Sequence, residues 1–325
     1  MKNYTTKIYD ASDCADWNIF ISEAKNATFL FNRFFMDYHS DRFQDYSLIV
    51  SDGEKWLAVL PAHQLGKVLY SHLGLTYGGL VYSERLKLVE VIAVLKSILL
   101  FLEQQAVEKL HLKMIPAIYH QKPADELDYA LFLAKSQMVR CDSLSVLDLT
   151  KPFAISKTRK ESIRRGIKNG LIIKEEINFR LFWEEILIPN LEKKHAAKPV
   201  HSIAEIEKLH QLFPDNIRHF NVYHQNKIVA GTTVFISENV AHPQYISGED
   251  NKNELGSLDY LYNHLIAEVF NEKQFFDFGI SNEEQGRKIN EGLVFWKESF
   301  GTGTVTQHFY EVETKNHHLL DNVLI

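Results

Sequence analysis

The chain has 325 residues, which is long for one hydrophobic core and suits two domains of ordinary size. Apolar residues make up 45% and charged residues 24%, the balance of a soluble globular protein, and a net charge of −6 argues against a broad nucleic-acid surface. The sequence has two cysteines without metal or disulfide spacing, no apolar leader and no run apolar enough to span a membrane. Together these features predict a cytoplasmic protein.

The first half predicts a strand, two helices, three strands, a helix, a strand, a helix and a last strand. Helical periodicity covers residues 13–24 and 84–105. A hairpin turns at Asp52-Gly53, a dipeptide favoured in tight turns, and "VEKLHLKM" (107–114) reads as a buried strand.

The second half repeats this order of elements. Its hairpin turns at Gln225-Asn226, and the flanking segments predict a helix over 179–194, strands over 240–247 and 274–280, and a helix over 257–270. We therefore expect an α/β fold of two tandem units, each a mixed sheet with helices on both faces. Pro152 marks the boundary, with an N-terminal domain at 1–152 and a C-terminal domain at 153–325.

The stretch "FFDFGIS" (275–281) contains the Asp-Phe-Gly tripeptide of protein kinases. A kinase also needs an upstream glycine-rich loop, a strand lysine and a His-Arg-Asp loop, and the sequence has none of them. The pattern instead indicates a central strand that ends at Gly279, followed by a polar loop at the strand edge where α/β proteins bind ligands. For Asp277 a carboxylate that caps a nearby backbone N–H is favoured over a direct chemical role.

The segment "KTRKESIRRGIKNG" (157–170) predicts a basic helix. Its cations at 157, 160, 164 and 168 form one stripe, with a single acid nearby in a chain that is acidic overall. The stripe is either a solvated charged face or a site for a phosphate-bearing ligand, with Arg164 and Arg165 as bidentate partners.

The C-terminal segment "FFDFGISNEEQGRKINEGLVFWKESFGTGTV" resembles the signature of the Fem-type acyltransferases, the double-domain branch of the GNAT (Gcn5-related N-acetyltransferase) superfamily. The likeness covers roughly residues 155–312, and the first half shares only the order of elements. It implies an N-acyltransferase that moves an acyl group from acyl-CoA to an amine of a nucleotide-linked amino sugar or another small cell-envelope precursor. It implies no metal and no tightly bound cofactor.

The resemblance also places Lys297 in an active cleft, where its cation would steady the charge that develops on a carbonyl; the alternative is a lysine that snorkels at a helix edge. For the general base the candidates are Glu249 or Asp250, acting through a water, with His242 as competitor, while Tyr245 could donate a hydrogen bond to the intermediate. The residues expected to bind substrate are Arg164, Arg165, Lys168, His195, His201, His242, Asp277, Ser281 and Asn290.

Gly256 and Ser257 begin a helix where single-domain GNAT enzymes hold the CoA pyrophosphate, so they are the candidates for binding that co-substrate. Glu254 and Asp259 add negative charge there, which weakens the match. Two alternatives stay open: a Fem-type peptidyltransferase that uses aminoacyl-tRNA, and a catalytically silent binding protein on the same scaffold. No pattern in the sequence indicates an oligomeric state.

Overall fold

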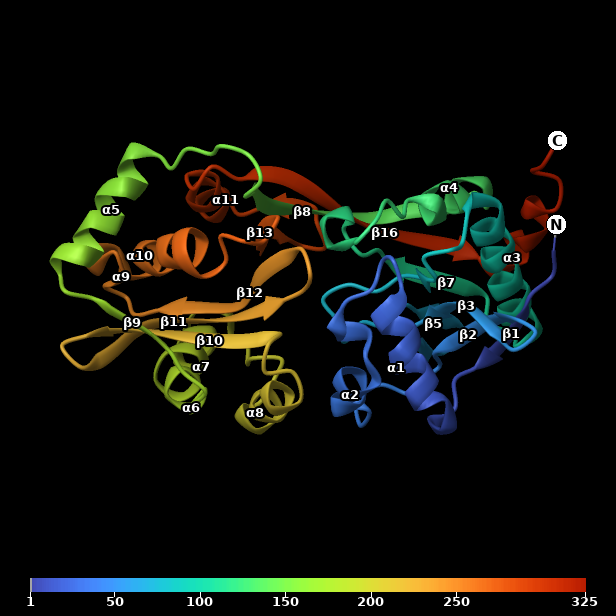
Figure 1. The fold of residues 1–325 in the computed structure, drawn as a ribbon, viewed down its shortest axis with the longest axis horizontal. Coiled ribbons are helices and arrows are strands. Elements are labelled where there is room, and N and C mark those ends of the chain that lie inside the picture. The colour runs from blue at the N-terminus through green and yellow to red at the C-terminus, as the bar shows by residue number, and fades with distance from the viewer. Residues whose placement is uncertain (1) are drawn as a thin grey trace. The chain divides into compact units, whose positions relative to one another are not determined.

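The computed structural model describes residues 2–325, except for the side chain of His195. The chain divides into two compact units. Unit 1 consists of residues 2–142, 284–287 and 306–325, and unit 2 consists of residues 143–283 and 288–305. Each unit is an α/β structure with helices on both faces of its strands (Figure 1).

Unit 1 has a four-stranded sheet in the order β1-β2-β3-β6 and a second group of strands in the order β4-β5-β7-β16. Its elements in chain order are β1 (Thr5–Ile8), α1 (Cys14–Glu23), α2 (Arg33–Met36), β2 (Leu48–Asp52), β3 (Lys55–Leu60), β4 (His63–Leu65), β5 (Val68–Tyr70), β6 (Val81–Tyr82), α3 (Leu88–Gln104), β7 (Lys109–Lys113) and α4 (Glu126–Leu133). The core of this unit forms around the apolar side of α3, which packs on β1 and β2.

Unit 2 has strands in the order β8-β13-β12-β11-β10-β9. Its elements are α5 (Lys157–Lys168), β9 (Ile172–Glu175), α6 (Arg180–Phe182), α7 (Ile188–His195), α8 (Ile203–Leu212), β10 (Ile217–His224), β11 (Lys227–Ile236), β12 (Val240–Gly248), α9 (Lys252–Leu255), α10 (Ser257–His264), β13 (Phe275–Ile280), the short strands β14 (Asn282–Glu283) and β15 (Lys288–Ile289), and α11 (Glu291–Glu298). In Figure 1, α5, α10 and α11 lie on one side of these strands and α6, α7 and α8 on the other.

The pairing of strands confirms two copies of one unit. In unit 1, β5 pairs with β7 in parallel, and in unit 2, β12 pairs with β13 in parallel. Each of these pairs is joined by a crossover connection that contains a helix, α3 in the first copy and α10 in the second. The hairpin turns lie where the sequence predicts them, with Gly53, Gln225 and Asn226 at positive φ.

The last strand of each copy begins in its own unit and ends in the other unit. β8 (Gln137–Asp148) ends the first copy, yet its residues from Ser143 onward belong to unit 2 and pair with β13. β16 (Gly303–Glu313) ends the second copy, and its residues from Thr306 onward belong to unit 1 and pair with β7. The compact units therefore do not follow a single cut near residue 152, because the sheet of each copy is completed by a strand from the other half of the sequence.

Helix α5 begins and ends as its sequence predicts. The side chain of Ser156 accepts a hydrogen bond from the N–H of Arg159 at the N-terminus, and Gly170, at φ 65°, follows the C-terminus. The helix packs directly on the start of α10, because Gly166 and Gly256 allow the two backbones to approach closely.

Replacing Gly256 by Ala should destabilise unit 2 by at least about 2 kcal/mol. Gly256 has φ 72°, which strains a residue with a side chain. A Cβ there would also lie 2.2 Å from the carbonyl oxygen of Ser162, a backbone atom that cannot move away without disturbing its helix. Gly170→Ala is the matched control, since Gly170 has φ 65° but no heavy atom within 4 Å of the position that a Cβ would take. Urea unfolding of both variants measures the difference, and equal losses would contradict the close helix contact.

Candidate functional site

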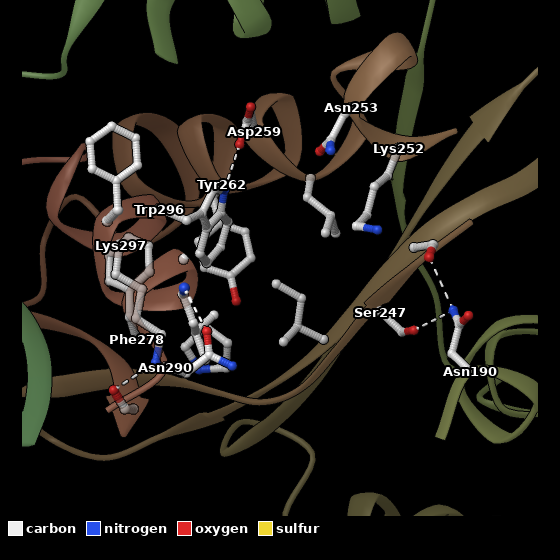
Figure 2. Close-up of a pocket in the computed structure, with 18 of the residues that line it drawn as sticks. Asn190, Ser247, Lys252, Asn253, Asp259, Tyr262, Phe278, Asn290, Trp296 and Lys297 are labelled. Carbon is white, nitrogen blue, oxygen red and sulfur yellow. Dashed lines mark hydrogen bonds between the residues drawn. The ribbon is translucent and has the colours of Figure 1, made fainter. Parts of the chain in front are cut away.

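A cavity opens in unit 2 where β12 and β13 diverge. The parallel pairing of these strands joins Val240 to Phe275 and Ala241 to Phe276 and extends no further among the described residues. Beyond it lies a cavity of about 1070 Å³ between the separating strands (Figure 2). The sequence predicts a ligand-binding edge where the second of these strands ends, and Gly279 and Ile280 line the cavity there. Its walls come from α5, α7, β12, α10, β13 and α11, and a large share of the lining side chains are apolar: Leu187, Leu191, Pro243, Ile246, Leu258, Phe278, Ile280, Leu293, Phe295 and Trp296.

Lys297 lies in the wall of this cavity and is 3% exposed. Its Nζ donates hydrogen bonds to the carbonyl oxygens of Gly279, at 2.9 Å, and Ile280, at 2.7 Å. Burial lowers the pKa of Lys297 to about 8, and the negative charge of Asp277 acts in the opposite direction. The lysine therefore does not snorkel into solvent, and it is a buried cation held at the end of β13.

Asp277 shapes the backbone on which Lys297 rests. Its carboxylate is fully buried, and Oδ1 accepts a hydrogen bond of 2.8 Å from the N–H of Gly279. Gly279 has φ 74°, so the backbone turns sharply inside β13, which ends at Ile280 and not at Gly279 as the sequence predicts, and a residue with a side chain would be strained at this turn. The interpretation of Asp277 as a cap of a nearby backbone N–H is confirmed.

His242, on β12, faces the same turn. Its Nδ1 lies 3.0 Å from the carbonyl oxygen of Asp277 and 3.4 Å from the Oδ2 atom of that residue. A Cβ placed on Gly279 would lie 3.1 Å from the Cε1 atom of the imidazole, so the ring packs directly on the turn. His242, Asp277, Gly279 and Lys297 thus form one connected group at the wall of the cavity.

A buried acid holds α5, α10 and α11 together beside the cavity. Asp259 accepts a hydrogen bond of 2.8 Å from Trp296 Nε1 and forms an ion pair of 2.5 Å with Arg159. The negative charge of Asp259, which weakens the match to a phosphate site in the sequence, is therefore balanced by Arg159. Figure 2 shows the hydrogen bond from Trp296, on the same side of the cavity as Lys297.

The opposite end of the cavity is more polar. Asn190 on α7 donates hydrogen bonds to Ser247 Oγ at 2.8 Å and to the carbonyl oxygen of Gly248 at 3.0 Å, which fixes the end of β12 (Figure 2). Arg165 and Lys252 line the cavity nearby, and Arg165 donates to the carbonyl oxygen of Asn253 at 3.1 Å. Neither cation forms an ion pair with a carboxylate among the residues that the structure describes.

Part of the predicted set of residues meets at this cavity. Lys297, His242, Arg165 and Asn290 line it, and Asp277 lies directly behind His242. The side chain of Asn290 also accepts a hydrogen bond of 3.0 Å from the N–H of Leu293, so it caps α11 and holds the start of that helix at the cavity wall.

The structure does not bring the remaining predicted residues to the cavity. Tyr245 points to the other face of β12, where it packs on Trp183 and its hydroxyl lies 2.5 Å from Nδ1 of His201. Glu249 lies at the end of β12 in a separate depression of about 410 Å³. The others that lie outside the cavity lining are the solvent-exposed Arg164 and Lys168, and the buried Ser281, Gly256 and Ser257.

Gly256 and Ser257 are covered by α5, as the short distance from Gly256 to Ser162 shows. The N–H of Gly256 is already donated to the carbonyl oxygen of Lys252, at 2.9 Å. This helix start therefore does not present an open cradle to a pyrophosphate. The side chain of His195 lies outside the described part of the chain.

Several lining residues were not foreseen. Asn190 follows a proline in a helix and has no sequence signal of its own, and Ser247 is one of several polar residues in its strand. Trp296 and Tyr262 read as ordinary core aromatics, and only the way α10 and α11 meet brings them to the cavity. Arg159 lies off the predicted cationic stripe.

Among residues 2–325, leaving aside the side chain of His195, no group of three or more histidine, cysteine or acidic side chains is arranged to hold a metal ion. Within the same range, no helix combines the length and the apolar character needed to cross a membrane.

The fold is that of tandem GNAT-like α/β structures, as the C-terminal segment predicts. No protein-family model matches the chain, and no curated protein matches its sequence. The solved structure of FemX is similar to it, with a TM-score of 0.68, 8% identity and coverage of 98% of this chain and 99% of that one.

Two further structures share the fold. L-PGS from Bacillus licheniformis has a TM-score of 0.57 and 14% identity, covering 82% of this chain and 83% of that one. A tandem GNAT protein from the clavulanic acid biosynthesis pathway has a TM-score of 0.50 and 12% identity, covering 96% and 99%. At these identities the likeness establishes the fold, and the chemistry has to be argued from the site.

Proposed function

We propose that the chain is an N-acyltransferase that transfers an acyl group from an acyl-CoA thioester to the amine of a nucleotide-linked amino sugar or another cell-envelope precursor. The observation that carries this proposal is the cavity between β12 and β13 with the buried cation of Lys297 in its wall. The fold supports it, because FemX and a tandem GNAT protein are among its structural neighbours.

The lining of the cavity suits the reaction. Apolar walls with a few fixed polar groups are typical of sites that bind small molecules and keep water out. When an amine attacks a thioester, negative charge develops on the carbonyl oxygen, and a preorganised cation in a site of low polarity stabilises that charge. Lys297 offers such a cation, since two main-chain carbonyls already fix its position.

The polar end of the cavity suits the phosphates of the donor. Arg165 and Lys252 lie there without a carboxylate partner among the described residues, and guanidinium groups bind phosphate in a bidentate manner. Phosphates occur in both acyl-CoA and aminoacyl-tRNA, and the net charge of −6 favours the small donor. In our proposal, side chains of α5 and α9 replace the helix start at Gly256 as the phosphate contact.

Thermal-shift measurements with acetyl-CoA, longer acyl-CoAs, nucleotide sugars and an aminoacyl-RNA mimic test the proposal. A donor at 100 times its Kd should stabilise the protein by about 2.7 kcal/mol. Arg165→Glu should abolish the response to CoA compounds, whereas Lys168→Glu, an exposed change on the same helix outside the cavity, should preserve it.

If no CoA compound raises the melting temperature and the RNA mimic does, acyl-CoA is not the donor. If neither class of donor raises it, the chain is not an acyltransferase, and a binding protein on the same scaffold remains.

A further inference from the structure

The attacking amine must lose a proton during acyl transfer, and the structure restricts which side chain can take it. Tyr245 and Glu249 do not line the cavity. Asp250 lies with Glu249 in the separate depression, where it forms an ion pair of 2.8 Å with Lys193. Asp259 borders the cavity, but both of its oxygens are engaged, one by Arg159 and the other by Trp296.

From these contacts we infer that His242 is the general base of the acyl transfer, an inference that rests on the proposed function. The hydrogen bond at its Nδ1 carries the argument. A main-chain carbonyl can only accept, so the 3.0 Å contact with the carbonyl oxygen of Asp277 requires a proton on Nδ1. In the neutral imidazole, Nε2 then keeps its lone pair, and it has no hydrogen-bond partner among the described residues.

The surroundings of His242 favour this exchange of a proton. Asp277, on β13, places Oδ2 at 3.4 Å from Nδ1, so a negative charge faces the imidazolium that forms when Nε2 takes up the proton. The positive charge of Lys297, on α11, opposes protonation of the imidazole. The hydrogen bonds of its Nζ hold that charge against the carbonyl oxygens of Gly279 and Ile280. On β11 the residue paired with His242 is the uncharged Phe235, and the charge of Asp259 on α10 is balanced by Arg159.

The complete step balances without another reactant. The amine nitrogen forms a bond to the carbonyl carbon of the thioester, and His242 Nε2 accepts the proton that the nitrogen releases. The carbon–sulfur bond breaks, the electron pair stays on sulfur, and the imidazolium returns the proton to the thiolate. The products are an amide and a free thiol, and the histidine ends in its starting state.

NMR spectroscopy tests the protonation state of His242 independently of activity. The full chain labelled with ¹⁵N-histidine, compared with His242→Gln for assignment, should show Nδ1 protonated and Nε2 unprotonated when the ring is neutral. A proton on Nε2 instead would overturn the assignment of this residue as a base, whatever the protein transfers.

Kinetics with the donor and acceptor found by screening form the second test. His242→Gln should lower kcat about 100-fold with little change in KM, and added imidazole should restore part of the rate. His264→Gln, a change in the same unit at a histidine that pairs with Glu268, should leave the rate unchanged.

Undiminished transfer by His242→Gln would overturn the general base and leave the proposed function intact. A wild-type protein that transfers no acyl group to any amine, while it binds CoA compounds, would overturn the proposed function and the base together.

Discussion

Replacing Lys297 by Met should lower the rate of acyl transfer by about 100- to 1000-fold, the range seen when one preorganised donor to a developing oxyanion is removed. The methionine keeps an apolar chain of similar length in the cavity wall and removes the cation together with its two hydrogen bonds to main-chain carbonyls. Lys273→Met is the matched control, because Lys273 Nζ also donates to two main-chain carbonyls, those of Ser237 and Glu238, but lies outside the cavity lining. Release of free thiol from the donor measures the rate.

The same lysine should set the basic limb of the pH–rate profile. Because burial lowers the pKa of Lys297 to about 8, the ammonium form that stabilises the oxyanion is lost as the pH rises through that value. The rate should therefore fall above about pH 8, and Lys297→Arg should move this fall to higher pH because a guanidinium stays charged. Full transferase activity in Lys297→Met, or a loss equal to that of Lys273→Met, would show that Lys297 has only a structural role.

Lowering the pH from 7.5 to 5 should cost the folded protein about 4 kcal/mol of stability through two histidines of unit 1. His63 and His72 lie in an aromatic cluster with Phe43 and Tyr70, and both ring nitrogens of His63 lack a hydrogen-bond partner. Desolvation lowers the pKa of His63 to about 4 and that of His72 to about 2; nearby positive charge adds to the effect at His72, and Asp45 opposes it at His63.

The sign follows from where the protons bind. The unfolded chain takes up these protons as the pH falls below about 6.5, while the folded state still excludes them, so stability is lost across that window. A pH of 5 is about 1.5 units below the pKa of about 6.5 that each histidine has in the unfolded chain. At roughly 1.36 kcal/mol per unit, each histidine therefore costs about 2 kcal/mol of folding stability. Urea unfolding at the two pH values measures the loss.

A His63→Phe/His72→Phe variant should remove this part of the pH dependence, because phenylalanine keeps a ring of comparable size in the cluster and cannot take up a proton. A smaller slope should remain from His219 in unit 2, whose pKa burial lowers to about 4. An unchanged loss of stability in the double variant would show that these two histidines titrate normally in the folded state.

The sequence predicts the fold because local patterns repeat in the same order twice. Turn dipeptides, strand patterns and helix periodicities are local properties of the chain, and these are the features that the structure confirms. The exchange of β8 and β16 between units has no such local signal. A final strand has the same pattern of residues whichever sheet it completes, so only the three-dimensional pairing reveals its place.

The sequence predicts the candidate site where it depends on the turn at Gly279 in β13, and not where it depends on side-chain direction. Asp277, Gly279 and Lys297 are close because of one strand end and one helix, which the sequence marks clearly. Tyr245 shares its strand with His242, but the two positions are three apart, and the alternation of side chains along a strand puts them on opposite faces, so only His242 faces the cavity. On α5, Arg165 and not Arg164 reaches the cavity, a difference of about 100° around the helix axis.

The exchange of final strands also determines when the first copy can finish folding during synthesis on the ribosome. β7 is made early, but the neighbour it pairs with, β16 (Gly303–Glu313), is made only after α11 of the second copy. The first copy must therefore wait, with one edge of β7 open, until translation has passed β16. A nascent chain of this kind offers an unfinished strand edge while the second copy is being made, the stage at which chaperones protect it from pairing with other chains.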